Sequence, residues 1–105
     1  MTKLYVTEYP DLPGAQATWA PQVVRDPPLV DQVPVAIGAS AAQSAVFDPR
    51  TRIVRLHADA ICSILIGPPG TTTATANNQR MAANQTEYKM VVNNAGHCVS
   101  VITNT

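Results

Sequence analysis

The chain has few charged residues, few aromatic residues and no net charge. Only 13% of its 105 residues are charged, and seven basic residues balance seven acidic ones. Proteins that bind nucleic acids concentrate positive charge on one face, so we expect no nucleic-acid partner. A surface with so little charge has weak protection against association. We therefore expect that copies of the chain, or a partner protein, cover part of this surface.

Long apolar runs and paired cysteine motifs are also missing. No apolar run approaches the ~20 residues that cross a membrane, and we expect no membrane partner. The segment MTKLYVTEYPDLPG lacks the apolar core of a signal peptide. Cys62 and Cys98 stand far apart and form no C-x-x-C pair. We expect two buried reduced thiols, with a disulfide between neighbouring strands as the alternative.

Proline is abundant, with nine residues, and it gathers in the first third of the chain. Proline blocks helix interiors and favours extended backbone before it. We therefore predict an extended strand and arm at 1–35 and a β domain at 36–105. The arm carries too many apolar residues for a disordered linker, so it must pack on its own domain or on a neighbouring subunit. The residues expected to contact a partner protein are Trp19, Val23, Val24, Leu29 and Val30.

Alternation of polar and apolar residues predicts most of the strands. The clearest segment is TRIVRLHADAICSILIG (51–67), whose even positions are almost all apolar. Because a typical strand has about 5–6 residues, we expect this segment to break near 57–59. Further short strands are predicted at 4–9, 33–40 and 44–48, whereas 73–84 is predicted to be a polar turn region.

The end of the chain predicts a hairpin. QTEYKMVV (85–92) alternates, NNAG (93–96) has turn composition, and CVSVIT (98–103) is a second strand. Turn signals recur about every 8–12 residues, which is typical of β-sandwiches and barrels. The predicted fold is therefore all-β: a single small β-sandwich or jelly-roll-like barrel with an extended N-terminal arm.

The segment ICSILIGPPGTTT (61–73) raises the question of nucleotide binding. Gly67 to Thr71 resembles the opening of the phosphate-binding loop of AAA-type ATPases. That loop continues with glycine and a lysine that neutralises phosphate charge, but Thr72 and Thr73 stand at those positions. The following TTTATANN is a poor start for a helix. We therefore predict a rigid exit from a strand and no nucleotide cofactor.

Histidines and cysteines offer little for metal binding or catalysis. His57 and Asp59 share one face of a predicted strand but lack the dense ligand spacing of a zinc site. His97 and Cys98 are neighbours on a strand, so their side chains point to opposite faces. We predict no metal, no cofactor and no catalytic residue among them.

Serines and arginines complete the polar candidates. Ser63 and Ser100 lack the G-x-S-x-G context of a serine nucleophile. Arg50, Arg52 and Arg55 form the one basic cluster, which we interpret as a solvated face or as a set of interface ion pairs. The chain is therefore not expected to be an enzyme.

A family resemblance rests on VRLHADAICSILIG, the Thr/Ala-rich turn after it, RMAANQTEY and the last strand. This pattern, over residues 51–103, resembles small virion proteins of tailed bacteriophages. The resemblance implies a β-sandwich structural subunit of the virion, assembled in the bacterial cytoplasm. The expected function is a capsid cement or decoration subunit, with the major capsid protein and further copies of itself as partners. A neck or tail accessory protein and a glycan-binding β module remain alternatives.

Overall fold

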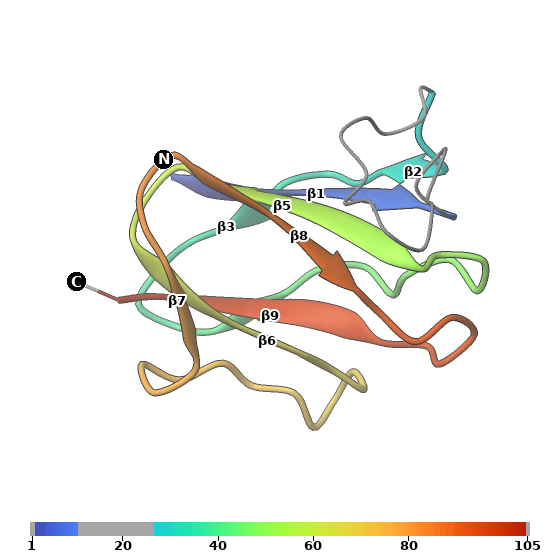
Figure 1. The fold of residues 1–105 in the computed structure, drawn as a ribbon. Helices are drawn as coiled ribbons and strands as arrows, with labels where there is room; N and C mark the ends of the chain where they lie inside the picture. Colours follow the sequence, from blue (N-terminus) through green and yellow to red (C-terminus); the bar gives the residue numbers. More distant parts are fainter. Residues whose placement is uncertain (1, 11–26, 105) are drawn as a thin grey trace, which may run out of the picture.

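The computed structural model describes residues 2–10 and 27–104, which form nine β-strands and no helix (Figure 1). This part of the chain therefore holds no helix able to cross a membrane. The strands are β1 (Lys3–Tyr9), β2 (Val30–Asp31), β3 (Val35–Ala36), β4 (Ala42–Gln43), β5 (Ile53–Ala58), β6 (Cys62–Gly67), β7 (Gln79–Met81), β8 (Gln85–Met90) and β9 (Cys98–Thr103).

The strands form two antiparallel sheets that stack face to face (Figure 1). The first sheet has the order β2-β1-β5-β8, with β3 also paired to β1, and the second has the order β4-β9-β6-β7. The predicted all-β sandwich is confirmed. Its core lies between the sheets and consists of Leu4, Val6, Val35, Ile37, Phe47, Val54, Leu56, Ala58, Cys62, Ile64, Met81, Val99 and Val101.

The long alternating segment 51–67 supplies one central strand to each sheet. β5 ends at Ala58 and β6 begins at Cys62, so the predicted break is confirmed. Between them the chain passes from the first sheet to the second. The side chains of Leu56 and Ile64, at even positions, are buried in the common core. The alternation therefore persists across the break because both strands face the same core.

β1 is an integral part of the sandwich. It pairs with β5 over six residues, and Leu4 and Val6 are fully buried. The predicted division at residue 36 thus separates β1 from the core that it helps to form. A deletion that removes residues 1–35 would remove this strand as well as the predicted arm.

Residues 29–37 run antiparallel along β1 as an interrupted edge strand. Asp31 pairs with Thr7, and Val35 pairs with Leu4. Three residues separate Asp31 from Val35, whereas two separate Leu4 from Thr7, so the edge strand carries one extra residue. Pro34 lies in this bulge. A residue without an N–H is accommodated at such an edge position because no ladder hydrogen bond is lost.

The predicted hairpin of 85–92 with 98–103 is wrong. β8 pairs with β5 in the first sheet, and β9 pairs with β6 in the second. The connection between β8 and β9 crosses from one sheet to the other, and backbone hydrogen bonds hold it to the loop at 47–49. The Asn94 N–H donates to the Pro49 carbonyl at 2.8 Å, and the Phe47 N–H donates to the His97 carbonyl at 2.8 Å. Packing between sheets decided the pairing, because Val99 and Val101 belong to the core.

Three shorter segments also differ from the prediction. Residues 44–48 do not form a strand, and the short β4 lies just before them. The strand predicted at 33–40 is limited to β3. The polar segment 73–84 contains β7, which pairs with β6. Such short strands depend on a neighbouring strand for their hydrogen bonds, and their own sequences carry little alternation.

Glu8 is a buried carboxylate that forms no ion pair within the described part of the chain. Glu8 is 1% exposed, and its Oε1 accepts hydrogen bonds from the Thr51 hydroxyl at 2.6 Å and the Asp48 N–H at 2.7 Å. Its Oε2 accepts one from Gln32 Nε2 at 2.6 Å. These bonds connect β1 to the bulge at 32–34 and to the turn before β5. A buried polar group must be hydrogen-bonded in this way to be tolerated.

Candidate assembly interface

The structure places part of the predicted contact set. Trp19, Val23 and Val24 lie outside the described residues. Val30 in β2 pairs with Glu8, and the Leu29 N–H donates to the Glu8 carbonyl at 2.9 Å. The backbone of the described end of the predicted arm therefore lies against the protein's own first sheet, with both side chains half-buried.

The edge strand β8 is a second candidate, and the sequence analysis did not single it out. Among the strands of residues 2–10 and 27–104, it is the last in the first sheet and pairs only with β5. Large apolar side chains on and just after it reach solvent: Tyr88 is 50% exposed, Met90 83% and Val92 68%. Exposed apolar groups in such a row mark a contact surface more often than single scattered ones do. Strand alternation shows that these residues share a face, but only the tertiary structure shows that their side chains reach solvent.

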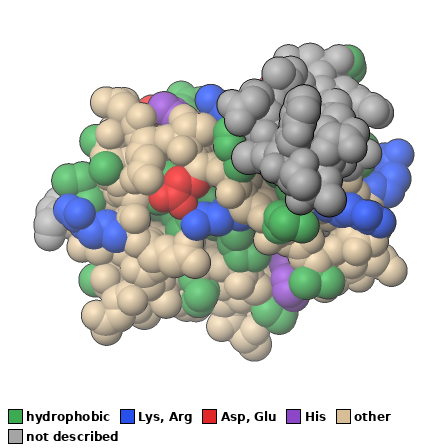
Figure 2. All heavy atoms as spheres, viewed as in Figure 1, with side chains coloured by type: hydrophobic (Ala, Val, Ile, Leu, Met, Phe, Trp, Pro, Cys, Tyr) green, Lys and Arg blue, Asp and Glu red, His purple; other side chains and the backbone are tan. Residues whose placement is uncertain are grey.

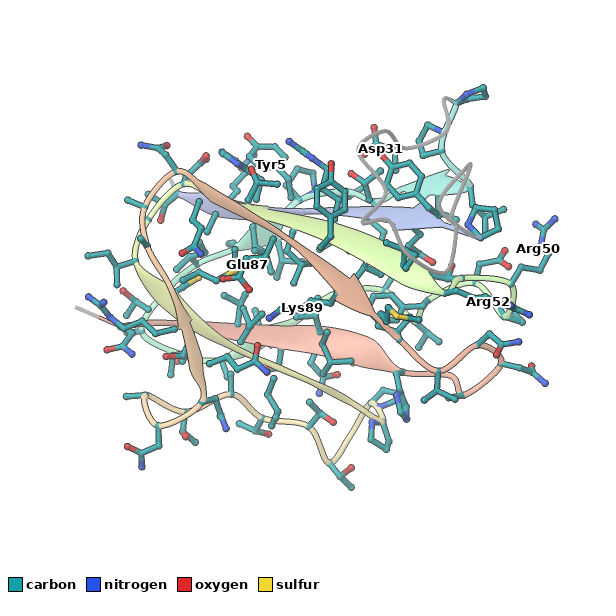
Figure 3. All side chains as sticks on the ribbon, in the orientation of Figure 1. Tyr5, Asp31, Arg50, Arg52, Glu87 and Lys89 are labelled. Atoms are coloured by element: carbon teal, nitrogen blue, oxygen red, sulfur yellow. The ribbon has the colours of Figure 1, made fainter. Side chains whose placement is uncertain are left out.

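The opposite side of β8 carries charge toward the space between the sheets (Figure 3). Lys89 Nζ lies 2.7 Å from Glu87 Oε1, and Gln85 Nε2 donates to Glu87 Oε2 at 2.7 Å. Both charged side chains are about one-quarter exposed. The charges of Glu87 and Lys89 neutralise each other. On the side of the molecule that Figure 2 shows, a few charged groups stand among mostly uncharged ones.

A groove of about 550 Å³ runs between β8 and the edge of the second sheet. On the β8 side its apolar lining comes from Met90, Val91 and Val92, and Lys89 and His97 contribute basic groups. Its remaining lining residues are Ile64, Leu65, Ile66, Asn77, Asn78 and Gln79. The groove therefore extends the apolar surface of β8 toward β6 and β7.

The histidine and acidic candidates form no metal cluster. His57 Nε2 lies 3.9 Å from Asp59 Oδ1, and His57 Nδ1 lies 2.8 Å from the Thr86 hydroxyl. The Tyr5 ring packs at 6.2 Å from the imidazole. Within 2–10 and 27–104, no three His, Cys, Asp or Glu side chains come close enough to hold a metal ion.

The two cysteines are free and buried. Cys62 pairs with Thr103 and Cys98 pairs with Gly67, so the thiols lie at opposite ends of the β6–β9 pair. Burial raises the pKa of both thiols, and the carboxylate of Glu87 raises that of Cys62 further. Each thiol is therefore protonated and weakly nucleophilic near neutral pH.

The two serines have structural hydrogen bonds. The Ser100 hydroxyl accepts from the Ala74 N–H at 2.9 Å, and the Ser63 hydroxyl accepts from Asn104 Nδ2 at 2.7 Å. Both serines are fully buried. They anchor the segment after β6 and the C-terminal end of β9 to the second sheet.

The Gly-Pro-Pro-Gly turn closes on itself after β6. The Thr72 N–H donates to the Pro68 carbonyl at 3.2 Å, and Gln43 Nε2 donates to the Thr72 carbonyl at 2.7 Å. A Cβ on Gly67 would lie only 2.6 Å from the Thr72 hydroxyl, and Gly70 has a φ of +86°. The first glycine therefore permits close packing of the turn, and the second permits its left-handed backbone.

The basic cluster is divided between a loop and a sheet face. Arg50 and Arg52 lie at the same end of the molecule (Figure 3), and Arg50 Nε is 3.2 Å from Asp48 Oδ1. Arg55 lies within β5, opposite Tyr88 of β8. Hydrogen bonds from the Arg50 side chain and backbone lower the pKa of Asp48 below its usual range. The contacts of Arg50 with Asp48 describe a capped turn.

Comparisons of the chain with protein-family models, with curated proteins and with solved structures give no match.

Proposed function

We propose that this chain is a non-catalytic structural subunit of a tailed-phage virion, and specifically a capsid cement or decoration subunit. The observation that supports the proposal most is the exposed apolar row Tyr88, Met90 and Val92 along an uncovered sheet edge. The resemblance of residues 51–103 to small phage virion proteins supplies the biological setting. The low charge of the whole chain fits a surface that is covered after assembly.

The proposed mechanism is the burial of apolar surface between neighbouring major capsid subunits. Each Å² of apolar area removed from water stabilises the contact by about 25 cal/mol. A subunit that contacts two capsid subunits at once resists their separation. The prolines of 20–34 reduce the backbone entropy that this segment loses on docking. No bond is made or broken in this function.

The copy number per particle tests the proposal and separates it from its closest alternative. Quantitative mass spectrometry of purified virions should find the chain in hundreds of copies, in proportion to the major capsid protein. A count of about six or twelve would instead indicate the rotational symmetry of a neck or tail ring. Absence of the chain from virions would refute both assignments.

The contribution of the predicted arm needs a variant that keeps β1. Residues 11–26 can be replaced by a short Gly-Ser connection, because the Leu29 N–H bonds to the Glu8 carbonyl and the two ends lie together. We expect this variant to fold and to lose most of its affinity for capsids. Val46→Ser, at an exposed apolar position, is the matched control. Full capsid binding by the replaced variant would contradict an anchoring role for Trp19, Val23 and Val24.

The glycan-binding alternative rests on the groove beside β8. Asn77, Asn78 and Gln79 line it and present amides suited to sugar hydroxyls. The described residues that line the groove include no tyrosine, tryptophan or phenylalanine, so they supply no stacking platform of the kind typical of sugar sites. A glycan array tests this alternative directly, and specific binding abolished by Asn78→Ala would favour it over the structural role.

A further inference from the structure

We infer that two copies of this chain pair with each other through β8, antiparallel, with Tyr88 of one copy opposite Tyr88 of the other. The two first sheets would then join into one continuous sheet. This inference goes beyond the virion proposal and concerns a contact that the isolated protein makes. Three features of β8 lead to it: its free edge, its charge order and its exposed apolar face.

The free edge presents a regular set of backbone groups. The Val91 N–H donates to the Arg52 carbonyl at 2.8 Å, in the same register that pairs β8 with β5. In an antiparallel ladder the residues that bond to one neighbour alternate with those that face the other side. Lys89 and Glu87 therefore bond to β5. The N–H and carbonyl groups of Thr86, Tyr88 and Met90 face the free edge.

These backbone groups restrict the possible registers. Two edges join only when an outward-facing residue of one strand opposes an outward-facing residue of the other. A two-fold axis at Tyr88 meets this condition, since it places Tyr88 opposite Tyr88 and Thr86 opposite Met90. It also uses the whole strand, because the N-terminal half of one copy lies against the C-terminal half of the other.

The charges select this register over its neighbours. An axis at Tyr88 places Glu87 opposite Lys89 of the second copy, and it does so twice. An axis at Glu87 would oppose two glutamates, and an axis at Lys89 would oppose two lysines. Like charges directly opposite each other on adjacent strands destabilise the pair, whereas opposite charges stabilise it.

The same charges protect the edge against other partners. Charged side chains that point inward on an edge strand prevent indiscriminate strand addition, because pairing would bury them. Glu87 and Lys89 already lie 2.7 Å apart within one copy. In the two-fold pair, each lysine would lie between two carboxylates and each carboxylate near two lysines. A second copy thus supplies opposite charges to Glu87 and Lys89, whereas a neutral strand would bury these two side chains without new partners.

The outer face adds apolar contact. Tyr88 and Met90 are half or more exposed in the single chain, and both lie on the face shared by the joined sheets. The contact is nevertheless one short strand per copy. It is smaller than the standard interface of about 1,600 Å², so we expect a dimer that dissociates on dilution through the micromolar range.

Sedimentation velocity of the isolated chain over a range of concentrations, combined with a charge swap, tests the inference. Glu87→Lys should oppose lysines at the interface, and Lys89→Glu should oppose glutamates. Each variant alone should dissociate at least about tenfold more readily than the original chain. An equal mixture of the two should recover the dimer, because every lysine then faces a glutamate, and the double swap in one chain should do the same.

A backbone variant tests the edge itself. Tyr88→Pro removes an N–H that faces the free edge and is not bonded to β5, so the fold should persist, as circular dichroism would show. The dimer should be lost, whereas the matched Tyr88→Val, which keeps the N–H, should retain it.

A wild-type chain that stays monomeric at high concentration would overturn the inference. So would folded single-swap variants that remain monomeric when mixed, or that dimerise as well as the original chain does. None of these results bears on the copy number in virions, so the virion proposal and the strand pairing fail separately.

Discussion

Replacement of Glu8 by alanine is the most informative single perturbation of this fold. The carboxylate is 1% exposed, accepts three hydrogen bonds and joins β1 to two loops. Alanine would leave the Asp48 N–H and the Thr51 hydroxyl without an acceptor. Each orphaned buried donor costs about 1–3 kcal/mol, so the expected loss of stability is about 2–6 kcal/mol. That is a large part of the roughly 5–15 kcal/mol that holds a small domain together.

Glutamine at position 8 should be far milder. Its amide oxygen still accepts from the Asp48 N–H and the Thr51 hydroxyl. Its NH₂ group would face Gln32, whose Oε1 is buried and has no hydrogen-bond partner within the described part of the chain. Rotation of the Gln32 amide would turn that oxygen toward the new donor and would release the Ala45 carbonyl, a net loss of about 1 kcal/mol.

Urea unfolding followed by circular dichroism measures both variants. Glu87→Ala, in an ion pair whose side chains are about one-quarter exposed, is the control, and at dilute protein it should cost less than about 1 kcal/mol. A Glu8→Ala variant within about 1 kcal/mol of the original chain would refute the role given to this network. Equal losses for alanine and glutamine would also refute it, because the argument depends on the acceptor and not on the negative charge.

The remaining predictions concern a turn, two thiols and a carboxyl group. Gly67→Ala should lower the urea concentration at the unfolding midpoint, because the new Cβ would lie 2.6 Å from the Thr72 hydroxyl. Recovery of the midpoint in a Gly67→Ala, Thr72→Ala double variant would support this cause, and no recovery would contradict it. Cys62 and Cys98 should react with Ellman's reagent at pH 8 much faster in urea than in the native state, because burial raises the pKa of both thiols. Their contribution to folding stability is present at neutral pH and is lost as the pH rises through the raised pKa values. Rapid labelling of the native protein would argue against the burial of the two thiols. NMR titration should find the pKa of Asp48 below that of an unfolded aspartate. The contribution of Asp48 to stability is therefore present at neutral pH and is lost as the pH falls through its native pKa. An unshifted pKa would argue against the capped turn.

Local patterns predicted the strands with a clear period of two. The segment 51–67 shows this, because its even positions 54–58 in β5 and 62–64 in β6 are buried and its break falls where the chain changes sheet. Residues 4–9 alternate as well, and they form β1. Short edge strands such as β4 and β7 escaped prediction because few residues in each make ladder contacts, so little of their sequence reflects the strand.

The partner of each strand was not predictable in the same way. The turn at 93–96 allows either a hairpin within one sheet or a crossing between sheets. The loop bonds at Pro49 and His97, together with six residue pairs between β6 and β9, decide for the crossing. The candidate interface has the same origin. Alternation places Tyr88 and Met90 on one face of β8, but only the stacking of the sheets shows that this face points away from the core, and only the sheet order shows that β8 is an edge.

By itself, then, the order of residues determined the fold class and the faces of its longest strands, because side-chain direction in a strand depends only on neighbours along the chain. The tertiary structure alone decided which strands are edges, which apolar residues stay in water and which buried carboxylate needs three donors. Those outcomes depend on contacts between segments that are distant in sequence, and no local period records them.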